Sequence, residues 1–218
     1  MKQISKEVVS KGLSYTGYRQ LTDGLLAQGK TTGGNHSEAM IHYTQLNNAR
    51  MKRLDKTGRL LEETAHQLKK IRRPMAWLIL TEAWCGDAAQ IIPVLQKMAE
   101  ANGNIDLRFI LRDEHPDIMD AFLTNGGRSI PIVIILDAVS LDVLGSWGPR
   151  PVEVQDMVMA ARKELNAISD EAAKKLRYNE LTIATQKWYA QDKTVSIQRE
   201  FLATLMESLA VGAAQAGL

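Results

Sequence analysis

The sequence predicts an α/β protein in which helices flank a mixed β-sheet and further helices extend both ends of the chain. Strand-sized apolar runs occur at 75–84, 105–111 and 132–136, and stretches with helical periodicity separate them. The chain has 218 residues, 45% of them hydrophobic and 24% charged, so it can bury a sizeable core and is not globally disordered.

The first third of the chain is expected to be helical. A short helix is predicted over 18–28, and a longer one over 37–56, with a serine at its start as the N-cap. A third helix runs from after Gly58 to Ile71. Pro74 ends it, because the residue before a proline disfavours helical dihedral angles.

The middle of the chain alternates between the two kinds of element. The predicted order is strand 75–84, helix 88–101, strand 105–111, helix 115–125, strand 132–136, strand 141–147 and helix 152–166. A short turn joins the last two strands, so we expect them to form a hairpin. A sheet with both a helical crossover and a hairpin contains parallel and antiparallel pairs.

The C-terminal part is again helical, with one helix starting near Ser169 and a second over 195–209. These patterns divide the chain into an N-terminal helical extension (1–57), an α/β domain (58–167) and a C-terminal helical extension (168–218). We expect the Trp188-Tyr189 pair to anchor the packing of the last helices.

The motif that carries chemistry is Trp84-Cys85-Gly86-Asp87-Ala88, where a predicted strand meets a predicted helix. The unpaired N–H groups and the dipole of a helix N-terminus favour the thiolate form of a cysteine placed there, and the thiolate is the nucleophile. Cys85 is the only cysteine, which excludes an intrachain disulfide and a thiolate zinc cage. Absent disulfides fit a reducing, cytoplasmic location.

This pattern resembles the thioredoxin superfamily, in which a Trp-Cys-Gly-Pro-Cys motif ends a central strand and opens a helix. Trp84, Cys85 and Gly86 match the start of that motif, and Pro93 matches a proline within the helix. Ile130-Pro131 matches the loop whose cis-proline faces the cysteine in the family. The resemblance covers residues 58–167 and implies a thioredoxin-like sheet flanked by helices.

Three departures from the family pattern bear on function. Ala88 replaces the second, resolving cysteine, so the chain cannot close an internal disulfide. Asp87 replaces the proline of the motif, and its negative charge should oppose a thiolate at Cys85 although it suits a helix N-terminus. Ile79 stands where the family has a buried acid.

The resemblance leaves two functions open. In the first, the protein is a monothiol thiol–disulfide oxidoreductase: Cys85 attacks a protein disulfide or a low-molecular-weight disulfide, and an external thiol resolves the mixed disulfide. Trp84 would then form a wall of the site, and Ile130 beside Pro131 would bind an extended substrate through its backbone. Gly86, Asp87 and Ala88 would modulate the thiol. In the second, the domain is a non-catalytic interaction module and Cys85 is a vestige.

Other classes of function have weaker support. Residues 1–73 carry 14 Lys and Arg against 6 Asp and Glu, but no aromatic stacking platform or groove-reading motif accompanies this charge, which argues against nucleic-acid binding. Residues 24–31 spell a phosphate-binding loop, although a polar segment precedes them and their interior favours a helix. We expect no membrane segment, metal or cofactor. The outer helices leave a homodimer open.

Overall fold

A four-stranded sheet in the order β2-β1-β3-β4 forms the centre of the protein. The computed structural model describes residues 3–215. Its strands are β1 (Met75–Thr81), β2 (Ile105–Leu111), β3 (Ile132–Asp137) and β4 (Val143–Trp147). β1 pairs in parallel with β2 and antiparallel with β3, and β3 pairs antiparallel with β4. The predicted mixed sheet and its hairpin are therefore confirmed.

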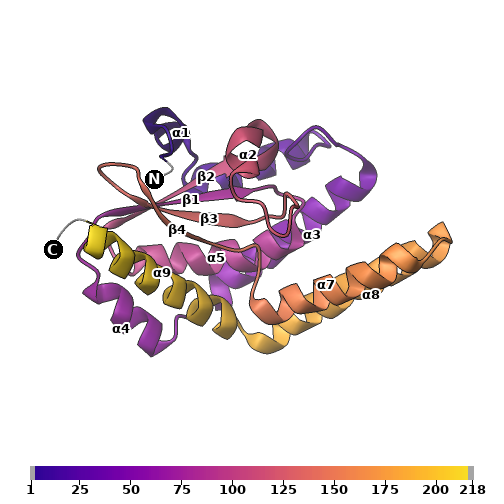
Figure 1. The fold of residues 1–218 in the computed structure, drawn as a ribbon. Helices are drawn as coiled ribbons and strands as arrows, with labels where there is room; N and C mark the ends of the chain where they lie inside the picture. Colours follow the sequence, from indigo (N-terminus) through magenta and orange to yellow (C-terminus); the bar gives the residue numbers. More distant parts are fainter. Residues whose placement is uncertain (1–2, 216–218) are drawn as a thin grey trace.

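Helices surround this sheet (Figure 1). In chain order they are α1 (Lys6–Lys11), α2 (Tyr15–Ala27), α3 (Glu38–Thr57), α4 (Glu62–Lys70), α5 (Gly86–Glu100), α6 (Pro116–Asp120), α7 (Val152–Ala167), α8 (Glu171–Asp192) and α9 (Val195–Gln215). A 3-10 turn, η1 (Arg112–Glu114), precedes α6. None of the helices in the described residues is both long and apolar enough to cross a membrane.

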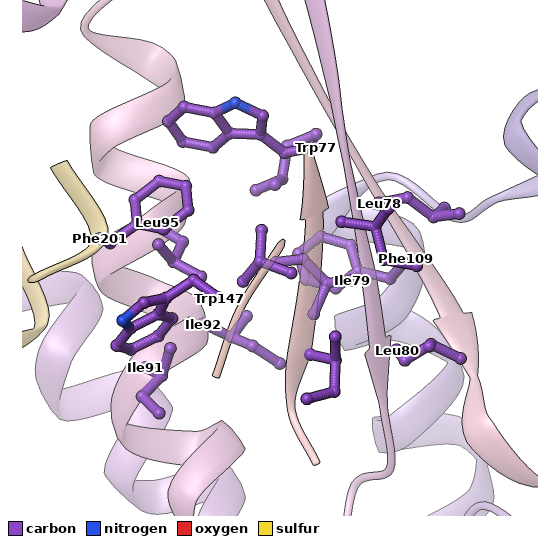
Figure 2. Packing of buried hydrophobic residues seen from close by; sticks show 14 of the residues in the cluster. Trp77, Leu78, Ile79, Leu80, Ile91, Ile92, Leu95, Phe109, Trp147 and Phe201 are labelled. Atoms are coloured by element: carbon purple, nitrogen blue, oxygen red, sulfur yellow. The ribbon is translucent and has the colours of Figure 1, made fainter. Parts of the chain in front are cut away.

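The core lies between the sheet and the helices α5 and α9. Every residue of β1 is buried, because helices cover both faces of this central strand. This is why its sequence is apolar at successive positions rather than at alternate ones. The ring of Phe201 on α9 meets the edge of Trp77 at a centroid distance of 4.7 Å and lies 5.9 Å from Trp147. Figure 2 shows these rings beside Leu95 of α5. The last helix is thus part of the core.

The helices α7 and α8 form an antiparallel hairpin that extends away from the sheet (Figure 1). The side chain of Asp170 caps α8 by accepting a hydrogen bond of 2.7 Å from the N–H of Ala173. The N-cap is therefore one residue later than the predicted Ser169.

Two helices differ from the predictions, and the structure of residues 24–31 bears on the phosphate-binding spelling. The short helix α1, capped by Ser5, was not predicted. The predicted helix 115–125 is wrong in its extent: α6 ends at Asp120, and a turn with positive φ angles at Asn125 and Gly126 follows it. Residues 24–27, the first half of the phosphate-loop spelling, belong to α2, so their backbone N–H groups cannot cradle a phosphate.

Candidate functional site

Cys85 is the N-cap residue of α5, four residues after the end of β1. Its backbone N–H donates to the carbonyl of Glu82 at 3.1 Å, which closes the turn between strand and helix. The N–H of Ala88 points at the cysteine Sγ across 3.5 Å. The motif therefore occupies the strand-to-helix junction that its sequence indicated.

The thiol of Cys85 faces the Ile130-Pro131 loop. Its Sγ donates a hydrogen bond of 3.3 Å to the carbonyl oxygen of Ile130, and the Ile130–Pro131 peptide bond is cis. Cys85 and Ile130 are both buried, with exposed fractions of 9% and 4%. The structure thus brings together two segments that are 45 residues apart in the chain.

The surroundings of Cys85 favour the neutral thiol. The pKa of Cys85 is raised to about 12: burial is the largest cause and the nearby carboxylate of Asp87 adds to it, whereas the Ala88 N–H and the guanidinium of Arg150 offset only part of the rise. The hydrogen bond to Ile130 acts in the same direction, because only the protonated sulfur can donate it. The dipole of α5 does not outweigh this burial.

The carboxylate of Asp87 is held by two residues from distant parts of the chain. The Nε of Arg150 donates to Oδ2 at 2.9 Å, its Nη2 lies 2.8 Å from the same oxygen, and the hydroxyl of Tyr189 donates to Oδ1 at 2.8 Å. The ion pair is largely buried, with side-chain exposures of 11% for Arg150 and 16% for Asp87. Asp87 therefore connects the N-terminus of α5 to α8 and to the segment before α7.

A glycine places Arg150 at the site. Gly148 has a φ of +127°, and a Cβ atom there would lie 2.4 Å from the carbonyl oxygen of Pro131. Only glycine fits both this backbone conformation and this close approach. The segment that carries Arg150 consequently runs directly against the Ile130-Pro131 loop.

Helix α8 covers the motif at Gly86. A Cβ atom at Gly86 would lie 3.2 Å from Nε2 of Gln186, so the absence of a side chain lets α8 pack closely. The Oε1 of Gln186 in turn accepts a hydrogen bond of 2.7 Å from Gln90 on α5. Helix α8 thus restricts access to Cys85. Whether the C-terminal helices cover the motif could not be predicted from the sequence.

A cavity of about 370 Å³ opens beside the motif, between α3 and the α7–α8 hairpin. Trp84, Gly86 and Asp87 form its floor. Trp84 is half-buried, and the guanidinium of Arg112 lies 4.8 Å from its ring centroid, outside this cavity. Trp84 lines this cavity, whereas Ile130, which accepts the hydrogen bond from Cys85, is not among its lining residues.

Several residues of this site were not predicted from the sequence. Arg150 and Gln186 reach the motif only through the tertiary fold, and no local pattern marks them. Tyr189 was expected only as a packing anchor, and its hydroxyl binds Asp87. Glu82 is fully buried three residues before Cys85, and burial raises its pKa. Ile79, at the position where the family has a buried acid, is a fully buried apolar core residue.

No group of three or more His, Cys, Asp or Glu side chains lies close enough to hold a metal ion within the described part of the chain.

A family model named thioredoxin matches residues 33–173, which include the sheet, the motif and the Ile130-Pro131 loop. This chain belongs to the thioredoxin family. The match confirms the resemblance that the motif indicated, and it includes α3 as well as the α/β core of this thioredoxin-family protein.

Two solved structures resemble this thioredoxin-family chain. One is an HIV epitope scaffold with a TM-score of 0.55 and 18% identity, and the match covers 92% of this chain and 96% of that one. The other is a protein of unknown function from Pseudomonas aeruginosa with a TM-score of 0.53 and 19% identity, covering 89% and 98%. At these identities the likeness is one of fold. No curated protein matches the sequence.

Proposed function

We propose that this thioredoxin-family protein is a binding protein in which Cys85 is kept as a neutral thiol that holds the Ile130-Pro131 loop. The observation that carries the proposal is the hydrogen bond from Sγ to the Ile130 carbonyl under the cover of α8. A thiol in this position acts as a small buried donor. It supports the shape of the site rather than reacting there.

The raised pKa strengthens this proposal. With its pKa raised to about 12, Cys85 is almost wholly protonated at pH 7. Attack on a disulfide needs the thiolate, so the rate falls with the thiolate fraction. With Ala88 in the position of a resolving cysteine, the chain also has no second thiol to release a bound substrate.

A monothiol thiol–disulfide oxidoreductase is the second candidate, favoured by the Ala88 N–H that points at Sγ. In this reaction the Cys85 thiolate attacks one sulfur of a disulfide, the other sulfur leaves as a thiolate, and a mixed disulfide forms. An external thiol then attacks the mixed disulfide and restores Cys85. Trp84, Ile130 and Pro131 would contact the substrate in this reaction.

The pH dependence of alkylation by iodoacetamide tests the proposal. We expect the rate at Cys85 to rise about tenfold per pH unit from pH 7 to pH 10 without levelling, because the thiol stays mostly protonated over this range. The denatured chain is the reference, and its rate should level near the ordinary thiol pKa of about 8.5. A plateau of the folded protein below pH 8 would favour the oxidoreductase.

Trapping provides a second readout, for which the single cysteine is an advantage. Wild-type protein incubated with oxidised glutathione should form little mixed disulfide, whereas the denatured chain should form it readily. Cys85→Ser, which has no thiol, is the matched control and should form no mixed disulfide. Rapid and complete formation by the folded protein would refute the proposal.

A further inference from the structure

We propose that the cavity between α3, the α7–α8 hairpin and the motif binds a small organic anion, with Arg50 and Arg162 holding its carboxylate or phosphate group. This inference rests on the proposed function, because it names the ligand class for the binding face beside Cys85. The volume of about 370 Å³ lies within the range of about 300–1,000 Å³ that is typical of small-molecule sites.

The lining of the cavity is strongly cationic. Its charged members are Arg50, Arg150, Arg162 and Asp87, which gives three positive charges against one negative charge. Arg150 and Asp87 neutralise each other in their ion pair. The charge of the two other arginines is therefore left in the cavity.

Arg50 projects from α3 toward the N-terminal end of α5. Its Nη1 lies 4.0 Å from the position of a Cβ atom at Gly86, and it donates to the neutral amide oxygen of Asn47 at 2.6 Å. Burial and the neighbouring charge of Arg53 both lower the pKa of Arg50. An anion would relieve both effects, because it would supply the opposite charge that this half-buried guanidinium lacks.

Arg162 approaches the same space from α7. Its Nη1 lies 3.9 Å from the position of a Cβ atom at Gly127, in the segment before the Ile130-Pro131 loop. Within the described residues, neither Arg50 nor Arg162 has a carboxylate oxygen within 4.0 Å. By contrast, Arg112 beside Trp84 is paired with Asp113, and Arg150 is paired with Asp87.

The remaining lining suits the organic part of a ligand. Tyr43 of α3, Trp84 of the motif and Tyr178 of α8 supply aromatic surface, and Leu165 and Leu181 supply aliphatic surface. Guanidinium groups bind carboxylate and phosphate oxygens in a bidentate manner, while aromatic walls bury flat apolar groups. An aromatic carboxylate or an aromatic phosphate monoester matches both the arginines and the apolar lining of the cavity.

Binding of small probes tests this assignment. Phenylacetate and phenyl phosphate are titrated into the full chain and followed by isothermal titration calorimetry and by NMR shifts, with 2-phenylethanol as the neutral analogue. We expect saturable binding of at least one anion, no binding of the alcohol, and weaker binding when salt rises from about 50 mM to about 500 mM. Binding of only one anion identifies the preferred acidic group.

Arginine variants locate the binding site. Arg50→Gln and Arg162→Gln should each weaken anion binding about tenfold or more, because each removes a charge-assisted contact. Arg199→Gln on the exposed side of α9 is the matched control and should bind as wild type does. Circular dichroism checks folding, and Arg162 is exposed, so its variant carries the test even if Arg50→Gln unfolds.

Three results would overturn the inference. They are the absence of saturable binding by both anions, equal binding of the alcohol, and equal weakening by Arg199→Gln. Cys85→Ser separates this inference from the proposed function: it should keep the anion affinity, since Sγ is not part of the lining. Reactive Cys85 together with arginine-dependent anion binding would refute only the proposed function.

Discussion

The α/β core and the α7–α8 hairpin are held in place by different forces. Helix α5 buries ten of its fifteen residues, nearly all of them apolar, against α3, α9 and the sheet. Helix α8 has only Thr185 and Tyr189 fully buried among its 22 residues, and it exposes Leu176 and Ile183. The core is thus stabilised mainly by apolar burial, whereas polar contacts at Asp87 and Gln90 connect the hairpin to it.

This contrast predicts which substitutions alter the site and which alter the stability of the whole protein. The core fixes Cys85 and the Ile130-Pro131 loop relative to each other. The hairpin, attached through a few polar groups, forms one wall of the cavity and the cover over Gly86. Changes in the core should therefore affect the stability of the whole protein, and changes at the polar contacts should affect the site first.

The largest expected effect is that of Trp77→Ala. Trp77 is fully buried and packs edge-on against Phe201, so its removal leaves a large cavity and should lower the free energy of unfolding by about 3–5 kcal/mol. Urea denaturation followed by circular dichroism measures this. Ile183→Ala, at a side chain with 69% exposure on α8, is the control and should change stability by less than about 0.5 kcal/mol. Equal losses would show that the hairpin is as tightly packed as the core.

Much of the core could be predicted from the sequence, because apolar periodicity and strand-sized runs reflect the burial that stabilises it. The run IVIIL after Pro131 forms β3, and the helix predicted from residue 88 is α5, which starts two residues earlier. Helix α1 was missed because six residues are too few for a periodic signal. Helix α6 ends at Asp120 rather than near residue 125, and apolar spacing does not show where so short a helix ends.

The candidate site was predictable only in its local part. The order of Trp84, Cys85 and Gly86 marks the strand-to-helix junction. The environment of the thiol depends on Arg150 and Tyr189, 63 and 102 residues away from Asp87 in the chain. Such polar contacts leave no periodic trace in a single sequence, so neither the raised pKa nor the cover by α8 could be predicted from it.

The next expected effect is that of breaking the buried ion pair. Arg150→Gln leaves the carboxylate of Asp87 with the Tyr189 hydroxyl but without a cation, and should lower the free energy of unfolding by about 3 kcal/mol. The double variant with Asp87→Asn should recover part of this loss, since it removes the uncompensated charge. Chemical denaturation at neutral pH measures both.

The matched control for the ion pair is Arg128→Gln. Arg128 also pairs with an aspartate, Asp120, at 2.6 Å, but both side chains are about half exposed. An exposed pair gains little because solvent screens it, so no measurable change is expected. If Arg150→Gln behaved like this control, the ion pair that joins α5 to the segment before α7 would not be a buried one.

The smallest effect concerns pH and tests the state of Cys85 directly. Its pKa is about 12 in the folded protein and about 8.5 in an unfolded chain, so the unfolded state loses this proton first as pH rises. The stability that the neutral thiol contributes is complete below pH 8.5 and declines above it. Between pH 9 and pH 10 the wild type should lose about 1 kcal/mol more unfolding free energy than Cys85→Ala does. The alanine variant retains every other titrating group, so the difference isolates the thiol. If the difference stayed constant over this range, Cys85 would titrate alike in the folded and unfolded states, and burial in the core would not keep its thiol neutral.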